Sequence, residues 1–222
     1  MNRLASLSEF GFKPHHIVDV GANVGSWTDQ AVHFFPDSYF LMVEAYGKHE
    51  PILKNICEKH DNVDYSIKLL SEKEAELDFY TIKNASSSDL ETGNSLLREN
   101  TYHYNKDNTD IKKIKATTLD KLLEQKQIRK VDLLKIDVQG AELLVLKGAE
   151  NALKNLSFCL LEVPFQKWND HAPTALEVVS FMNHKGFTLY DVLDANRASN
   201  YTVSVDFLFK KDNGKYNCPN IL

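Results

Sequence analysis

The stretch DVGANVGSW occupies residues 19–27 and begins inside the apolar run HIVDV at residues 16–20. Glycine adopts positive φ angles readily and carries no side chain, so Gly21 and Gly25 predict a tight turn from a strand into a helix. Asn23 tolerates the left-handed conformation better than most residues. A bare structural turn is one interpretation. A ligand site is the other, because open α/β sheets bind ligands at the carboxyl ends of their strands.

An acidic residue downstream favours the ligand interpretation. Glu44 ends the next apolar run, FLMVE, about 20 positions after the glycines, which is where a carboxylate binds ribose hydroxyls. A dinucleotide site would need glycine where Asn23 and Ser26 stand, and this disfavours NAD. Asp19 would attract a positively charged cofactor and repel a pyrophosphate. The four features together favour S-adenosylmethionine.

The composition is that of an ordinary globular protein. The chain has 222 residues, 43% of them apolar, and a formal net charge of -5, so nothing indicates a general grip on nucleic acid. We expect one domain over residues 1–222. No stretch approaches the length of a membrane span or a signal peptide, which predicts a cytoplasmic protein. Cys57, Cys159 and Cys218 lack metal-type spacing and are expected as free thiols.

Strand-like runs alternate with helix-like segments, and this predicts a mostly parallel sheet with helices on both faces. Residues 63–70 read as one strand and residues 141–156 as one helix. The last two runs, residues 187–193 and 201–211, are joined by a segment too short for a crossover helix, so we expect them to pair antiparallel. The runs AELDFYTI and IKKIKATTL predict a small β-insertion.

A long polar stretch, residues 84–110, separates the two strands of that insertion. Such long connections are usually functional or disordered. We expect it to act as a mobile cover over an acceptor site, with Leu96, Leu97 and Arg98 as contacts. The rival interpretation is an insertion without a role.

The segment LLKIDVQGAELLVLKGAENAL, residues 133–153, is the third informative stretch. Side chains alternate along a strand, so Lys135 and Asp137 share a face near its carboxyl end. Gly140 then permits a turn, and Glu142 falls in the first turn of a helix. A structural ion pair with a helix-stabilising glutamate would explain the same residues. A charged pair in an apolar strand is nevertheless more expected at a functional site.

The chain resembles the FkbM-type family of class I S-adenosylmethionine-dependent methyltransferases. The resemblance lies in DVGAN-x-G, FLMVEA, ATTLDKLL, KID-x-x-GAE-x-x-VLKGA and VDFLF, in the family's order from about residue 11 to residue 210. It implies a Rossmann-like seven-stranded sheet with an antiparallel last strand, and O-methylation of sugar or other natural-product hydroxyls. Gln139 departs from the family pattern, which commonly has glutamate there. EAYGKHEP also replaces the commoner Glu-Pro after the second strand.

The resemblance also implies roles for individual residues. Glu44 would bind the ribose hydroxyls, Leu70 and Ser71 would lie near the adenine, and Asp137 would lie beside the cofactor amine or the acceptor. The full set of implied cofactor-binding residues is Asp19, Gly21, Ala22, Asn23, Gly25, Trp27, Glu44, Ala45, Leu70, Ser71 and Asp137.

The base that removes the hydroxyl proton has four candidates: Asp137, Glu142, Glu162 and His171. No metal is predicted, although three of these carboxylates would suit a divalent ion if they met. The predicted partner is a small-molecule or glycan acceptor rather than nucleic acid, and the oligomeric state is open. The alternatives are a methyltransferase-like binding protein without turnover, methylation of protein or nucleic acid, and an NAD-linked oxidoreductase.

Overall fold

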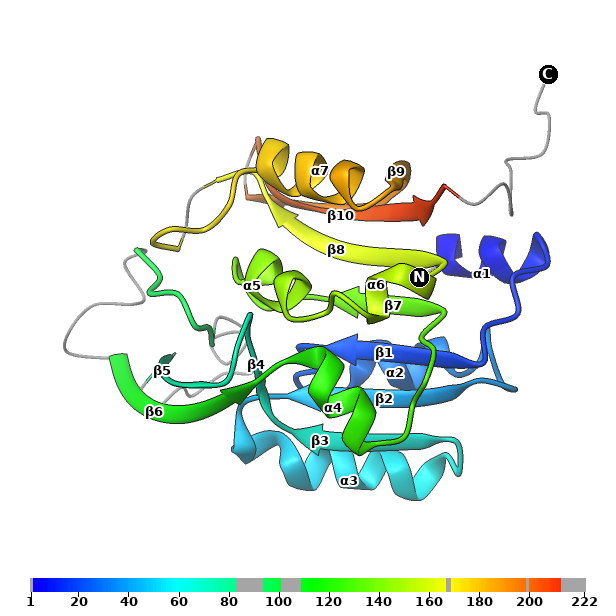
Figure 1. Ribbon diagram of the computed structural model, residues 1–222, viewed down its shortest axis with the longest axis horizontal. Coiled ribbons are helices and arrows are strands. Elements are labelled where there is room, and N and C mark those ends of the chain that lie inside the picture. Colours follow the sequence, from blue (N-terminus) through cyan, green and yellow to red (C-terminus); the bar gives the residue numbers. More distant parts are fainter. Residues whose placement is uncertain (1, 83–93, 101–108, 167–168, 199, 213–222) are drawn as a thin grey trace.

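A seven-stranded sheet forms the centre of the molecule (Figure 1). The computed structural model describes residues 2–82, 94–100, 109–166, 169–198 and 200–212. In spatial order the strands are β3 (Val63–Ile67), β2 (Tyr39–Glu44), β1 (His16–Val20), β7 (Leu133–Ile136), β8 (Phe158–Pro164), β10 (Tyr201–Lys211) and β9 (Phe187–Ala198). The pairs from β3 to β8 are parallel, and β10 is antiparallel to both neighbours. The predicted mostly parallel sheet with a reversed last strand is confirmed.

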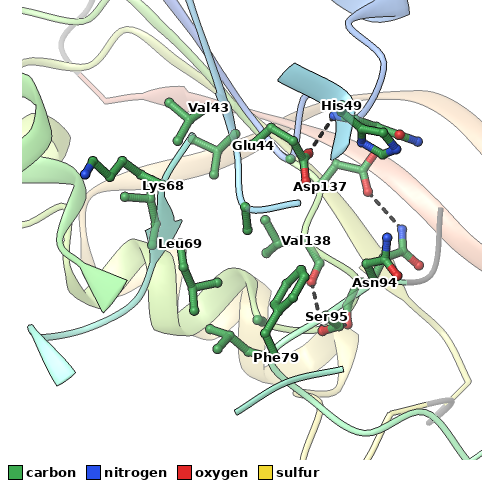
Figure 2. A pocket seen from close by; sticks show the side chains of 18 residues that line it. Val43, Glu44, His49, Lys68, Leu69, Phe79, Asn94, Ser95, Asp137 and Val138 are labelled. Atoms are coloured by element: carbon green, nitrogen blue, oxygen red, sulfur yellow. Dashed lines mark hydrogen bonds between the residues drawn. The ribbon is translucent and has the colours of Figure 1, made fainter. Parts of the chain in front are cut away.

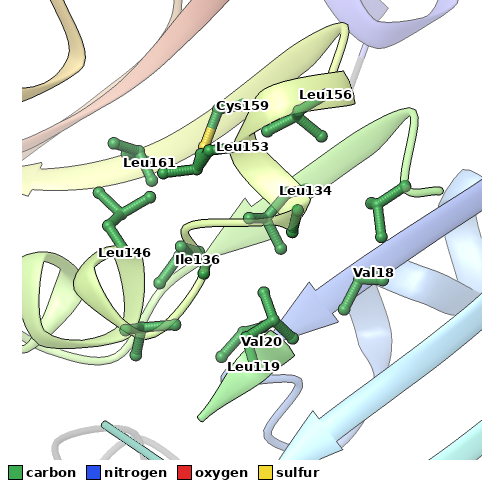
Figure 3. Close-up of a cluster of buried hydrophobic side chains, with 14 of the residues drawn as sticks. Val18, Val20, Leu119, Leu134, Ile136, Leu146, Leu153, Leu156, Cys159 and Leu161 are labelled. Carbon is green, nitrogen blue, oxygen red and sulfur yellow. The ribbon is translucent and has the colours of Figure 1, made fainter. Parts of the chain in front are cut away.

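Helices cover both faces of this sheet, as predicted (Figure 1). One face packs against α1 (Asn2–Glu9), α2 (Ser26–Ala31) and α3 (Glu50–Lys59). The other packs against α4 (Leu119–Gln125), α5 (Glu142–Lys147), α6 (Ala152–Asn155) and α7 (Ala175–His184). Figure 3 shows this second layer, where Val20 of β1 lies near Leu119 of α4 and Leu146 of α5 lies near Ile136 of β7. The inner strands are apolar on both faces because both are buried.

The segment after β7 is two short helices, so the prediction of one continuous helix over residues 141–156 is wrong. The break follows Gly148, where a Cβ would lie 2.2 Å from the carbonyl oxygen of Ser71. Asp120 accepts hydrogen bonds from the backbone N–H groups of Asn151 and Ala152, at 2.7 and 2.9 Å. The Asp120 carboxylate thus caps the N-terminus of α6, which begins as a separate helix.

The predicted β-insertion is present as a three-stranded sheet of β4 (Leu69–Leu70), β6 (Thr109–Thr117) and β5 (Ala75–Ile82). β5 and β6 pair antiparallel as expected. The predicted single strand over residues 63–70 is wrong, because it divides at Lys68 and its last two residues pair with β6. Leu69, Phe79 and Ala116 form an apolar cluster with Tyr46, which follows β2. This cluster holds the insertion against the carboxyl end of β2.

Two sequence expectations fall partly outside the described residues. Of the predicted cover at residues 84–110, the structure describes residues 94–100 and 109–110. Cys57 and Cys159 are free thiols, as expected, whereas Cys218 lies outside the described ranges. In the described part of the chain, no helix combines the length and the apolar character that crossing a membrane requires.

The turn after β1 is shaped by contacts with neighbouring elements. Gly21, Asn23 and Gly25 have φ angles of 77°, 51° and 76°, which confirms the predicted left-handed turn. A Cβ on Gly21 would lie 1.8 Å from the carbonyl oxygen of Asp137, and one on Gly25 would lie 2.4 Å from Cδ1 of Ile56. The sequence suggested that the missing side chains leave room for a ligand. The structure shows that the protein's own backbone and core already occupy that space.

Gly21→Ala is expected to reduce the free energy of unfolding by about 2 kcal/mol more than Gly11→Ala does, the usual scale for overpacking. Gly11 is a matched control because its φ of 83° carries the same left-handed penalty, yet its added Cβ meets nothing within 4 Å. Urea denaturation of the two variants and the wild type measures the difference. Equal losses would show that the ends of β1 and β7 separate without cost.

Candidate active site

A pocket opens at the carboxyl ends of β1, β2 and β7, with the small sheet along one side (Figure 2). It holds about 760 Å³ of empty space, part of which is open to solvent. This is the edge at which open α/β sheets bind ligands. The predicted residues that line it are Gly21, Asn23, Glu44, Ala45, Leu70 and Asp137.

The other predicted cofactor residues do not line this pocket and have structural contacts instead. Asp19 is buried beneath it, Ala22 and Gly25 pack in the turn, and Trp27 packs beside the apolar cluster of the α1–α3 face. Ser71 is buried, and its N–H donates to the carbonyl of Thr117. These residues therefore support the residues that line the pocket and do not line it themselves.

Glu44 is fixed at the end of β2 by two backbone hydrogen bonds. One carboxylate oxygen accepts from the N–H of Asn23 and the other from the N–H of Tyr46, each at 2.7 Å. Burial raises the pKa of Glu44, while the two N–H donors oppose this change. Because each oxygen retains a further lone pair, the carboxylate can still accept hydroxyl hydrogens at the pocket wall.

Asn23 adds an acceptor beside this carboxylate. Its Oδ1 is buried and accepts no hydrogen bond from any residue that the structure describes. Buried polar atoms are nearly always hydrogen-bonded in folded proteins. An acceptor of this kind in a pocket wall fits a ligand that brings its own N–H or O–H group.

The opposite part of the pocket is apolar. In the view of Figure 2, Glu44 and Asp137 lie at one end and Leu69 and Phe79 at the other. Leu96 joins the apolar residues from the segment 94–100. Leu96 was predicted as a contact of the cover. Leu69 and Phe79 were missed from sequence, although the alternating pattern of AELDFYTI places Phe79 on the buried face of its strand. Such a surface suits a flat ring system.

His49 is a further residue that sequence reasoning missed. It belongs to the short 3-10 helix η1 (Gly47–His49), lines the pocket and is 3% exposed. Its ring packs edge-on against Tyr46, with centroids 5.1 Å apart. The signal in the sequence was its place five residues beyond Glu44, in the segment where the chain departs from the family pattern.

Lys135 connects two carboxylates beneath the pocket floor. Its Nζ lies 3.0 Å from Oδ1 of Asp19 and 3.5 Å from Oδ2 of Asp137. The predicted Lys135–Asp137 pair is present, but the closer partner is Asp19 on the neighbouring strand. Burial disfavours the charge of Lys135, yet the two carboxylates outweigh it and hold its pKa above the ordinary value.

Asp137 is the ionised carboxylate of the pocket. Burial opposes its ionisation, but the Lys135 ammonium and hydrogen bonds with Glu162 and Gln139 prevail and lower its pKa. Glu162 behaves oppositely: burial and the nearby charge of Asp137 raise its pKa to about 9. Two adjacent carboxyl groups with diverging pKa values are typical of acid–base sites.

The amide of Gln139 also joins these two groups. The Nε2 atom of Gln139 donates to Oδ1 of Asp137 at 3.0 Å and to Oε2 of Glu162 at 2.8 Å. The other oxygen of Glu162 accepts from the hydroxyl of Ser204 at 2.7 Å and from the amide of Asn196 at 3.1 Å. Glu162 is thus tied to both β10 and β9.

Glu142 and His171 are separate from this pair. Glu142 is 1% exposed and does not line the pocket; its Oε1 accepts from the N–H groups of Val138 and Gly140, at 3.2 and 3.0 Å. His171 is exposed, with a φ of 62°. Of the four predicted bases, the structure brings together Asp137 and Glu162. No group of three His, Cys, Asp or Glu side chains able to hold a metal occurs among the described residues.

The segment 94–100 closes one side of the pocket. The Ser95 hydroxyl lies 3.2 Å and 3.0 Å from the carbonyl oxygens of Val138 and Gln139 (Figure 2). Ser95 also pairs with Tyr80 through the backbone. Farther along, the Asn169 amide donates to the carbonyl of Leu97. The described part of the predicted cover therefore contacts the turn that carries Gln139.

The chain matches a family known from sequence. The family model described as Methyltransferase FkbM domain matches residues 19–189, which is more than half of the chain. A curated relative, the hexuronic acid methyltransferase AglP of Haloferax volcanii, is 42% identical over 50 residues. That match spans 22% of this chain and 21% of the relative.

Solved structures of methyltransferases share the fold. Magnesium protoporphyrin IX methyltransferase from Synechocystis PCC 6803 with bound S-adenosylhomocysteine has a TM-score of 0.55 and 9% identity, covering 95% of this chain and 80% of that one. The complex of M. capricolum TrmK with S-adenosylhomocysteine also has a TM-score of 0.55 and 9% identity, with 96% and 69% covered. At such identities the likeness shows the class I methyltransferase fold and nothing finer.

Glu142 predicts a pH dependence of stability. Burial raises its pKa from 4.5 to about 7, so the folded chain binds a proton that the unfolded chain has released in this window. Its contribution to stability is therefore present below the unfolded value and is lost as the pH rises toward 7. Glutamine does not titrate, so this loss is absent in Glu142→Gln. As the pH rises from 4.5 to 8, the free energy of unfolding of the variant should therefore increase by about 3 kcal/mol relative to that of the wild type.

Chemical denaturation of both proteins across that range measures the difference. The carbonyl oxygen of the new amide can still accept from Val138 and Gly140, which keeps the turn in place. Glu124→Gln, at an exposed site on α4, reports what the same chemical change does elsewhere. A difference between Glu142→Gln and wild type that does not vary with pH would contradict the prediction.

Proposed function

Because the chain belongs to the FkbM methyltransferase family, with S-adenosylmethionine as its cofactor, we propose that it methylates a hydroxyl group of a sugar or another small glycan or natural-product acceptor. One observation carries the proposal: an ionised carboxylate, Asp137, lines the pocket beside the residues suited to the cofactor. The relative named as a hexuronic acid methyltransferase supports a sugar acceptor over a short match. The family removes the NAD-linked alternative.

The cofactor half of the site consists of groups held by the backbone. Glu44 is oriented by two N–H donors and can accept from the ribose hydroxyls. The buried Oδ1 of Asn23 can accept from a further donor, and Leu70 and Phe79 offer an apolar surface for the adenine. S-adenosylmethionine supplies an electrophilic methyl group on a positively charged sulfur when bound.

The acceptor half must orient a hydroxyl and accept its proton. Asp137 is ionised because Lys135 lies 3.5 Å from its Oδ2, and it is one-third exposed at the pocket. It is therefore the base that we assign to the hydroxyl proton. Glu162, Ser204 and Asn196 form a polar group beside it on β8, β10 and β9. A positioned base of this kind is the main chemical contribution that the protein makes.

The proposal treats residues 1–222 as one catalytic domain acting in the cytoplasm. Its rivals are a binding protein that holds the cofactor without turnover, and methylation of a protein or nucleic acid. The deciding experiment combines calorimetry of S-adenosylmethionine binding with mass spectrometry of a panel of hexoses, uronic acids, peptides and RNA. A mass increase of one methyl group on a sugar supports the proposal. Binding without any methylated product favours the first rival.

Glu44→Ala is expected to weaken S-adenosylmethionine binding by roughly 1.5–3 kcal/mol, the usual range for hydrogen bonds to a charged group. Isothermal calorimetry measures the dissociation constant. Glu50→Ala, at an exposed glutamate in the first turn of α3, should retain wild-type affinity. Unchanged affinity in Glu44→Ala would remove this residue from the ribose site.

Asp137→Asn should slow methyl transfer by about 10²–10⁴-fold at saturating cofactor, which is the usual contribution of a positioned base. The amide has nearly the same shape, so cofactor affinity should change little. Turnover, affinity and melting temperature are measured on the same preparation, with the exposed Asp61→Asn as control. A raised dissociation constant with normal turnover would instead assign Asp137 to the cofactor amine. A lower melting temperature alone would mark it as structural.

A further inference from the structure

Gln139 contacts both carboxyl groups of the acceptor half and lines the pocket. We propose that Gln139 is a positioning residue: its side-chain amide bridges Asp137, which lines the pocket, and Glu162, which does not, and so fixes the carboxylate that faces the acceptor. This inference rests on the proposed function, because it assigns Asp137 the proton of the acceptor hydroxyl. It concerns a position at which the chain departs from the pattern of the family it resembles.

The hydrogen-bonding capacity of an amide explains why glutamine suits this position. Nε2 has two hydrogens, and each meets one carboxyl oxygen, at 3.0 Å for Asp137 and 2.8 Å for Glu162. Lys135 holds the second oxygen of Asp137, and Ser204 and Asn196 hold the second oxygen of Glu162. Each carboxyl group is therefore held on both oxygens, and the amide links the two in addition to the hydrogen bond between the carboxyl groups themselves.

The backbone of Gln139 provides a second, independent observation. Its φ is 54°, a left-handed conformation that is strained for a residue with a Cβ. Neighbouring groups hold this conformation: the Ser95 hydroxyl hydrogen-bonds to the Gln139 carbonyl, and Glu142 accepts from the N–H groups on either side. Strain of this kind persists where the surroundings enforce it, and it clusters at functional sites.

The charges around the pair show what the amide prevents. The ionisable groups around it come from five elements: Lys135 on β7, Asp19 on β1, Glu142 on α5, Asp206 on β10 and, next to Asp206, Asp194 on β9. All except Lys135 are acidic, and Asp19 shares that single ammonium with Asp137. An ionised glutamate at position 139 would replace two donors with a further negative charge. A neutral donor therefore favours the ionised form of Asp137 more than a glutamate would.

A titration that does not depend on turnover tests the inference. The full-length protein is labelled with ¹³C at its Asp and Glu carboxyl carbons, and Asp137→Asn and Glu162→Gln assign the two signals. Gln139→Glu should move both titration midpoints upward by about one pH unit or more, because it removes two donors and adds a like charge. Gln139→Met, of similar length but without donors, should move both upward by less.

Gln127 provides a matched control, because it is exposed and its φ of 59° is nearly that of Gln139. Gln127→Glu and Gln127→Met repeat the same changes on a similar backbone and should leave both midpoints in place. Midpoints unmoved in both Gln139 variants would overturn the inference. If Gln139→Glu fails to fold, Gln139→Met still decides the question.

Kinetics then link the pair to the reaction. The substrate is a sugar of the panel that the wild type methylates. In Gln139→Met, the acid limb of the profile of kcat/KM against pH should move to higher pH, while the affinity for the cofactor is unchanged. A structural residue would lower the melting temperature and leave that limb in place, which would overturn the positioning role. Failure of the proposed function is a separate result: no acceptor is methylated by wild type, while the carboxyl titrations still respond to Gln139.

Discussion

The buried contact between Asp19 and Lys135 is the interaction on which both the sheet and the site depend. Asp19 is 1% exposed, lies opposite Lys135 in the β1–β7 register, and also accepts from the hydroxyl of Thr28 on α2 at 2.8 Å. Breaking such a pair costs about 3–5 kcal/mol, although its net contribution to stability is small. The pair matters for the site because it holds the Lys135 ammonium where it also contacts Asp137, and this contact favours the ionised form of that carboxylate.

The two halves of the site are built in different ways. On the cofactor side, the turn after β1 and the carboxylate of Glu44 are fixed by backbone contacts, since Gly21 lies against the backbone of Asp137. On the proposed acceptor side, the contacts run between side chains of the turn after β7 and of β8 and β10. Under the proposed function, substitutions among these side chains would change the acceptor side while the backbone at the cofactor side keeps its shape. The cofactor side is also the side that can be recognised from sequence, because its backbone contacts depend on local motifs such as the glycine turn.

That difference explains which predictions came true. The glycine turn, the mostly parallel sheet and its reversed last strand follow from local patterns, and the structure agrees with them. The partner of Lys135 was assigned to Asp137 from strand alternation, whereas register with a strand 116 residues away made Asp19 the closer partner. The division of residues 63–70 and the break after Gly148 were missed because both depend on tertiary contacts, with β6 and with the Ser71 carbonyl. Phe79 reaches the pocket through the same kind of long-range packing.

The candidate bases show most clearly what local sequence leaves open. Asp137, Glu142 and Glu162 are carboxylic acids of nearly equal intrinsic strength, and spacing alone does not rank them. In the fold, Lys135 favours the charge on Asp137, burial raises the pKa of Glu142 to about 7, and burial with the charge of Asp137 raises that of Glu162 to about 9. At neutral pH, Asp137 therefore carries the charge beside a protonated Glu162, because the lysine two residues earlier points to the same face. The buried ion pair that fixes the β1–β7 register thus also decides which carboxylate can accept a proton.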